Sequence, residues 1–192
     1  MAMKRFLCVI MAVVMFLPLF AQERMQFKGI PMEGTVKNFA SKLVQKKFKV
    51  VEEDADATVL QGTFAGRIGA YVILYPISER NSNIGQITVL VEAGENWNTI
   101  KENYEDVVDL YTEKYGEPKG HLEEFEGDVI SEIVSLREDK CIYTSYWEFE
   151  YGSIEVLLKS LPFPIIKNDF VVITYRDDES NKQIRKDMLE DI

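Results

Sequence analysis

Few side chains in this 192-residue sequence are of the types that perform catalysis, and their spacing matches no catalytic arrangement that we recognise. His121 is the only histidine, so a metal site with two histidine ligands is excluded and a Ser/His/Asp triad would have to use this residue. His121 lies in the largely polar segment 119–124, which predicts an exposed loop. The sequence therefore nominates no catalytic residue, and we do not expect an enzyme.

The acidic run 52–56 offers oxygen ligands for a hard cation such as calcium. A calcium loop counted from Asp54 needs a glycine at its sixth position and a bidentate acid at its twelfth, but these positions hold Val59 and Ala65. We interpret the run as a solvated turn, and we expect neither a metal ion nor a cofactor.

Three glutamates, Glu148, Glu150 and Glu155, could meet across a hairpin as the paired carboxylates of a glycosidase. Trp147 and Tyr151 are close to them in the sequence and could form a platform on which a sugar ring stacks. A glycosidase needs a deep cleft, which a small sheet does not readily form. A hydrolase is therefore the alternative that we favour least.

The first 21 residues are typical of a secretory signal peptide. Lys4 and Arg5 precede the apolar segment 6–20, and Ala21 supplies a small residue at the expected cleavage site. At about 1.5 Å per residue this segment would span roughly 22 Å, which is short of the ~30 Å hydrocarbon core of a membrane. We expect export to the periplasm or the extracellular space, with residues 22–192 as the mature domain and no membrane span after cleavage.

Cleavage would also change the charge and the thiol content of the protein. Loss of Lys4 and Arg5 takes the formal net charge from −10 to −12, and so acidic a surface repels nucleic acid. Loss of Cys8 leaves Cys141 as the only thiol, so no disulfide can form within the mature domain. Cys141 opens an apolar run, which favours a buried, inert thiol.

Segment 97–115 gives the strongest secondary-structure signal. Its apolar residues recur at steps of three and four, which predicts an amphipathic helix. Such a stripe has to pack on an apolar surface, and runs of alternating apolar residues before and after it predict the strands of a sheet. We expect the stripe, with Trp97, Tyr104, Tyr111 and Tyr115, to face that sheet.

The remaining signals complete a single α+β domain, with a mainly antiparallel sheet of about seven strands and helices packed on one face. Each half of the chain has a helix followed by strands and an aromatic-rich hairpin, which suggests two similar helix-plus-strands halves. We expect strands at 50–51, 58–64, 70–77, 86–91, 142–149, 154–158 and 170–175, and further helices at 35–48, 128–136 and 177–192.

The most informative non-catalytic feature is the segment LPFPII at 161–166. Its two prolines resist regular strand pairing, so large apolar side chains are held in an extended connector. An exposed connector of this kind would bind a partner, whereas one folded down would close the core, and we favour the second interpretation. The candidate interaction surface comprises Leu161, Phe163, Ile165, Ile166, Trp147 and Tyr151.

FKGIPMEGT at 27–35, GTFAG at 62–66, Trp97 and KYGEP at 114–118 resemble small secreted proteins of unknown function from gut-associated Gram-negative bacteria. The resemblance covers much of the first 118 residues. It implies export and one compact domain, and it brings no catalytic residue. The succession of helix and strands is also similar to the layout of the β-lactamase-inhibitory-protein and outer-membrane-assembly lipoprotein folds, a similarity of architecture alone.

These observations lead to a hypothesis of function. We expect a secreted or periplasmic, non-catalytic binding protein, whose partner is an unknown protein or a small ligand. An inhibitor-like protein that caps a secreted enzyme is a more specific alternative. The small hydrolase with carboxylates on the second hairpin is the third.

Overall fold

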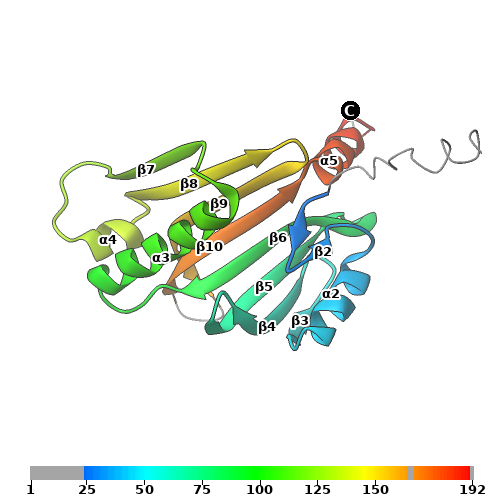
Figure 1. The fold of residues 1–192 in the computed structure, drawn as a ribbon, viewed down its shortest axis with the longest axis horizontal. Coiled ribbons are helices and arrows are strands. Elements are labelled where there is room, and N and C mark those ends of the chain that lie inside the picture. Colours follow the sequence, from blue (N-terminus) through cyan, green and yellow to red (C-terminus); the bar gives the residue numbers. More distant parts are fainter. Residues whose placement is uncertain (1–23, 164–166, 191–192) are drawn as a thin grey trace, which may run out of the picture.

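One large antiparallel sheet organises the molecule (Figure 1). The computed structural model describes residues 24–163 and 167–190, and in them eight strands pair in the order β3-β4-β5-β6-β10-β9-β8-β7. The expected α+β class with a mainly antiparallel sheet is confirmed. Its strands are β3 (Lys49–Glu53), β4 (Thr58–Phe64), β5 (Arg67–Ser78), β6 (Asn81–Glu92), β7 (Gly120–Phe125), β8 (Cys141–Phe149), β9 (Gly152–Pro162) and β10 (Lys167–Asp177).

Four helices and a small hairpin complete the described structure. The hairpin is formed by β1 (Gln26–Phe27) and β2 (Ile30–Pro31), and the helices are α2 (Val36–Gln45), α3 (Trp97–Tyr115), α4 (Glu132–Arg137) and α5 (Asp178–Glu190). The predicted signal peptide at 1–21 lies outside the described residues, as do Ile165 and Ile166 of the candidate interaction surface.

The strand order is symmetric about the pair β6–β10, so the sheet consists of two similar halves. In each half a helix precedes a meander of four strands: α2 precedes β3 to β6, and α3 precedes β7 to β10. The last strands of the two meanders pair with each other through seven residue pairs, with Thr88 opposite Thr174 near their centre. The two helix-plus-strands halves suggested by the sequence are therefore present.

The expected exposed loop around His121 is instead an edge strand. Residues 120–125 form β7, which pairs with β8 and raises the strand number of the sheet to eight. An edge strand leaves one side of its backbone and much of its side-chain surface in water, so a polar segment is tolerated there. The following helix is also shorter than expected, because it begins after Ser131 and not after Asp128.

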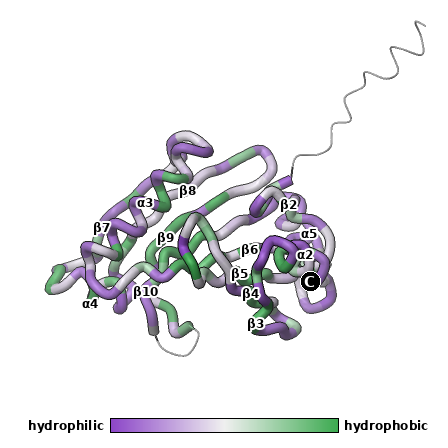
Figure 2. The backbone as a smooth tube through the Cα atoms, turned by 60° about the horizontal axis from the view of Figure 1, so that its bottom comes forward, coloured by the Kyte–Doolittle hydropathy of each residue, from purple (hydrophilic) through white to green (hydrophobic). Residues whose placement is uncertain are grey.

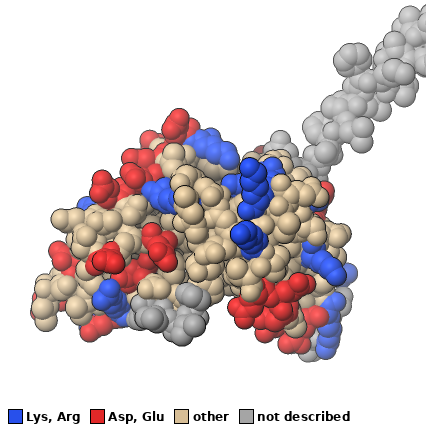
Figure 3. All heavy atoms as spheres, turned by 90° about the horizontal axis from the view of Figure 1, so that it is seen from below, with Lys and Arg blue, Asp and Glu red and all other residues tan. Residues whose placement is uncertain are grey.

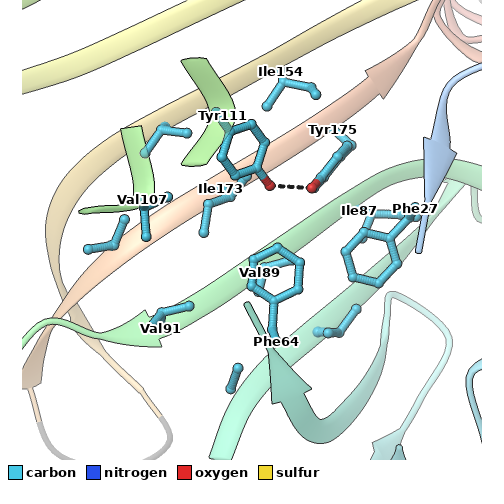
Figure 4. Close-up of a cluster of buried hydrophobic side chains, with 14 of the residues drawn as sticks. Phe27, Phe64, Ile87, Val89, Val91, Val107, Tyr111, Ile154, Ile173 and Tyr175 are labelled. Atoms are coloured by element: carbon cyan, nitrogen blue, oxygen red, sulfur yellow. Dashed lines mark hydrogen bonds between the residues drawn. The ribbon is translucent and has the colours of Figure 1, made fainter. Parts of the chain in front are cut away.

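Helix α3 packs its apolar stripe on the sheet, as expected. The hydroxyl groups of its two buried tyrosines have partners: the Tyr104 hydroxyl lies 2.9 Å from Ser145 Oγ, and the hydroxyls of Tyr111 and Tyr175 bond to each other (Figure 4). A buried hydroxyl without a partner would be costly, so these bonds explain how a tyrosine-rich stripe can face a core. The Asn96 side chain caps the first turn by accepting from the Thr99 amide at 3.1 Å.

Helix α2 covers the other half of the same sheet face. Thr35 Oγ1 accepts from the Asn38 amide at 3.3 Å, and the helix buries four apolar residues. The β1–β2 hairpin adds Phe27, whose ring stacks on Phe64 and meets Tyr175 edge-on at 5.3 Å. Figure 2 shows the apolar residues concentrated on the central strands beneath these elements. The residues that α2 buries are Val36, Phe39, Ala40 and Leu43.

The buried carboxylate of Asp177 joins the two ends of the described chain. Its Oδ1 accepts from the Met25 amide and from Arg24 Nε, both at 3.0 Å, and its Oδ2 lies 2.8 Å from the other end of the Arg24 guanidinium. Oδ2 also accepts from the Ser180 amide at 3.2 Å, which caps α5. An unpaired carboxylate at this depth would be destabilising, so these bonds tie the N-terminal segment and α5 to β10.

Gly152, at the start of β9, provides a test of this packing. A Cβ there would overlap both the Arg176 carbonyl oxygen and the Met25 side chain, whereas a Cβ at Gly120 would meet nothing within 4 Å. We expect Gly152→Ala to cost about 1–3 kcal/mol, because backbone and Met25 must move apart. The melting temperature should fall by roughly 2–4 °C per kcal/mol, and it should stay nearly unchanged in the control Gly120→Ala. Equal melting temperatures for the two variants would contradict this account.

Candidate functional site

The sheet face opposite α2 and α3, which we call the open face, carries an apolar cluster. Residues paired across neighbouring strands share a face, so the register defines rows of side chains. One row on the open face crosses all eight strands and has Tyr71, Leu90, Val172 and Leu157 at its centre. The complete row is Lys49, Gln61, Tyr71, Leu90, Val172, Leu157, Thr144 and Leu122.

Sheet and connector residues alone form this cluster, and no residue of a described helix belongs to it. Five members are buried by their neighbours, and the rest are partly exposed to solvent around them. The buried members are Val59, Ile73, Leu90, Phe170 and Val172, and the partly exposed members are Ala57, Tyr71, Tyr75, Leu157, Leu161 and Phe163.

Phe163, the first residue after β9, packs on the open face. The Phe163 ring lies edge-on to Tyr71, with centroids 5.0 Å apart, and it also faces Phe170 at 6.4 Å. The expectation that Leu161 belongs to the connector is wrong, because Leu161 and Pro162 still pair with β10. Proline is tolerated there because, beyond Leu157, β9 pairs with β10 but no longer with β8, so one side of its backbone lacks a partner.

Trp147 does not belong to an exposed platform. It lies opposite Ile154 on the helix-covered face, is 2% exposed, and donates from Nε1 to the Gly116 carbonyl oxygen at 2.8 Å. The hairpin register decides this, because it aligns Trp147 with the row of β9 that points into the core. Trp147 is therefore unavailable to a partner, in contrast to the role considered from the sequence.

Tyr151, the other aromatic residue considered for the platform, lines a pocket of ≈ 350 Å³ on the helix side of the molecule. Its ring stacks on Phe149, with centroids 5.6 Å apart and an interplanar angle of 11°. Tyr115 from the end of α3 and Arg24 from the N-terminal segment contribute further walls. Neither the pocket nor its cationic residues were foreseen from the sequence, because its walls come from three segments that are at least 30 residues apart along the chain.

Two of the three glutamates of the second hairpin already have cationic partners. Glu148 pairs with Lys119, and Glu155 accepts from Arg176 at 3.1 Å. Glu150 is exposed in the turn between β8 and β9. The paired carboxylates of a glycosidase would instead face each other across a substrate cleft. The geometry does not support the hydrolase alternative on this hairpin.

His121 belongs to a hydrogen-bonded chain that sequence reasoning missed. Its Nδ1 lies 2.8 Å from Ser145 Oγ, which also bonds to the Tyr104 hydroxyl, and its Nε2 lies 3.5 Å from Glu123. Burial raises the pKa of Tyr104, so this hydroxyl stays protonated and can donate. Ser145 is 0% exposed beneath α3, and a nucleophile there could not reach a substrate. The available signal in the sequence was Ser145 itself, a polar residue among the alternating apolar residues of β8.

Comparisons with protein-family models, with curated proteins and with solved structures found no match. The assignment of a function therefore depends on the geometry. Within residues 24–163 and 167–190, no group of three or more histidine, cysteine, aspartate or glutamate side chains is placed to hold a metal ion. The helices in that part of the chain are also too short or too polar to cross a membrane.

Cys141 is buried at the start of β8, and burial raises the pKa of its thiol to about 11. At pH 8 roughly one thiol in a thousand is then ionised. We expect a Cys8→Ser variant, in which Cys141 is the only cysteine, to react slowly with iodoacetamide when folded and rapidly when unfolded in guanidinium. The folded rate should rise as the pH approaches 11. Equal rates at pH 8 in the two states would contradict a buried, protonated thiol.

Ser145→Ala tests whether the His121 chain is structural. We expect it to destabilise the protein by about 1–3 kcal/mol, because the buried Tyr104 hydroxyl loses its partner. In a Tyr104→Phe background the same change should cost less, since no donor is left unsatisfied. Urea unfolding of the wild type, the two single variants and the double variant gives the coupling free energy between the two side chains. Strictly additive losses would show that the hydrogen bond contributes nothing.

Proposed function

We propose that this chain is an exported, non-catalytic binding protein, and that its open face binds another protein. The observation that carries the proposal is the apolar cluster on that face, in which no described helix takes part. Its partly exposed members leave apolar surface in water, and such surface often marks an interaction site. The partly exposed tyrosines Tyr71 and Tyr75 and the Phe163 ring are also residue types that are enriched at protein interfaces.

The dimensions of the open face suit a protein partner. Strands lie about 4.8 Å apart, so eight strands extend over roughly 34 Å. An interface of standard size buries about 800 Å² on each partner, which corresponds to a disc of roughly the same width. The extended face can therefore accommodate such a footprint.

The arrangement of charges also supports an interface. The apolar cluster occupies the central strands, while the charged residues Lys49, Glu52 and Glu92 mark positions near the rim of the same face. Figure 3 shows acidic side chains gathered at the β3 end, near the exposed residues 52–56. An apolar centre with a polar rim is the usual anatomy of a protein interface. An acidic rim of this kind does not favour nucleic acid.

Export is supported by the sequence of residues 1–21, with two basic residues, an apolar segment and a small residue before the polar continuation. The single cysteine that would remain, Cys141, is buried and so compatible with an oxidising compartment. The proposed location is the periplasm or the extracellular space.

Two alternatives make different predictions. An inhibitor-like protein would copurify with a secreted enzyme whose activity falls when this protein is added. A hydrolase would lose turnover on substitution of His121, Glu148, Glu150 or Glu155, whereas a binding protein would have no turnover to lose. The paired glutamates and the buried Ser145 favour a binding protein over a hydrolase.

The proposal is tested by placing a charge on each side of the molecule. Leu157 lies on the open face, and Leu110 is an exposed leucine of α3, which covers the other face. We expect Leu157→Lys to abolish copurification of a partner from the exported fraction and Leu110→Lys to leave it intact. Phe163→Ala should weaken binding without unfolding the protein, since Phe163 contacts Tyr71 at the edge of the cluster.

The melting temperature of each variant separates binding from folding. A large fall in the melting temperature of Phe163→Ala would show that the Phe163 side chain is part of the hydrophobic core. Retention of the partner by a folded Leu157→Lys variant would overturn the proposal that the open face binds it.

A further inference from the structure

The pocket beside Tyr151 has walls from three distant parts of the chain. The N-terminal segment supplies Arg24 and Met25, the end of α3 supplies Lys114 and Tyr115, and the end of β8 with the turn after it supplies Phe149 and Tyr151. Its volume, ≈ 350 Å³, lies at the lower end of the range for small-molecule sites. It is on the helix side of the molecule and so is separate from the open face.

The walls are held in place before any ligand arrives. Met25 packs directly on Gly152, where even a Cβ would overlap it, and the Met25 amide bonds to Asp177 at 3.0 Å. The Arg24 guanidinium is fixed by Asp177 and by the Met32 carbonyl oxygen, which lies 2.6 Å from its Nη2. A preformed site loses less conformational entropy on binding than a site that has to order itself.

One side of the pocket is an aromatic platform. The near-parallel rings of Phe149 and Tyr151 continue into Tyr115, whose ring centroid is 5.3 Å from that of Phe149. All three residues are partly exposed. A platform of this kind suits an aromatic ring, which can stack on it, or a sugar ring, whose apolar C–H face can pack on it.

The other determinant is the charge of Lys114. Its Nζ lies 4.7 Å from the centroid of the Tyr115 ring, and it forms none of the ion pairs seen in the described residues. The charge of Arg24, in contrast, is compensated by Asp177. Although the whole protein is acidic, charges beyond about 8 Å are largely screened at physiological salt, so the local cation decides which ligand is favoured.

We propose that this pocket binds a small ring compound that carries one carboxylate. The ring stacks on Phe149 and Tyr151, and the carboxylate pairs with the Lys114 ammonium. One uncompensated cation matches one negative charge. The carboxylate can belong to an aromatic acid or to a sugar acid, since both combine a ring face that packs on aromatic side chains with a single anionic group.

The test is a titration of the purified protein, followed by NMR, with two pairs of probes. Benzoate and benzyl alcohol compare a charged and a neutral aromatic ring, and glucuronate and glucose compare a charged and a neutral sugar. We expect one of the two acids to perturb the resonances of Tyr115 and Tyr151 with a dissociation constant at or below about 1 mM. Its neutral counterpart should bind at least about fivefold more weakly. The acid that binds shows whether the natural ligand carries an aromatic ring or a sugar ring.

Lys114→Gln should raise the dissociation constant of the acid about tenfold, because a charge-assisted hydrogen bond is lost. It should leave the dissociation constant of the neutral probe unchanged. Lys42→Gln is the matched control, since Lys42 occupies the last turn of α2 as Lys114 occupies that of α3. Tyr151→Leu should weaken the binding of both the acid and its neutral counterpart. The proposal is overturned if neither acid shifts these resonances at about 10 mM, or if Lys114→Gln and Lys42→Gln have equal effects.

Discussion

The pairing of β6 with β10 is the interaction on which the rest of the structure depends. Without it the molecule would be two separate meanders of four strands, each with a single helix. The pairing places Tyr175 of β10 where it meets Phe27 from the first half and Tyr111 from the second (Figure 4). One central strand therefore completes the core under both halves. The same pairing makes the open face continuous over eight strands, which neither half could provide alone.

The sequence predicted the elements with strong periodicity. The stripe of α3 and the alternating residues of the inner strands are required by burial on one face, and burial leaves a clear period. The edge strand β7 escaped because an edge needs few apolar residues, so GHLEEF has the composition of a loop. Strand β9 was predicted too short because Pro162 suggested an earlier end, although the unpaired side of the strand tolerates it.

The candidate site was less predictable than the fold, because it depends on register and on contacts between distant segments. Trp147 and Tyr151 are four residues apart, yet one lies in the core and the other lines a pocket. Local composition does not distinguish them, because the hairpin register decides which of them faces inward. Lys114 looks like an ordinary cation at a helix end until the fold brings Phe149 beside its neighbour Tyr115.

The shared carboxylate of Asp177 has a practical consequence for handling this protein. Arg24, at the beginning of the described chain, and Ser180, in the first turn of its last helix, depend on the same buried group. Trimming either end would therefore leave part of that group without a partner, and damage at one terminus would loosen the other. Boundaries for expression should keep both ends, with any affinity tag separated from Arg24 by a spacer.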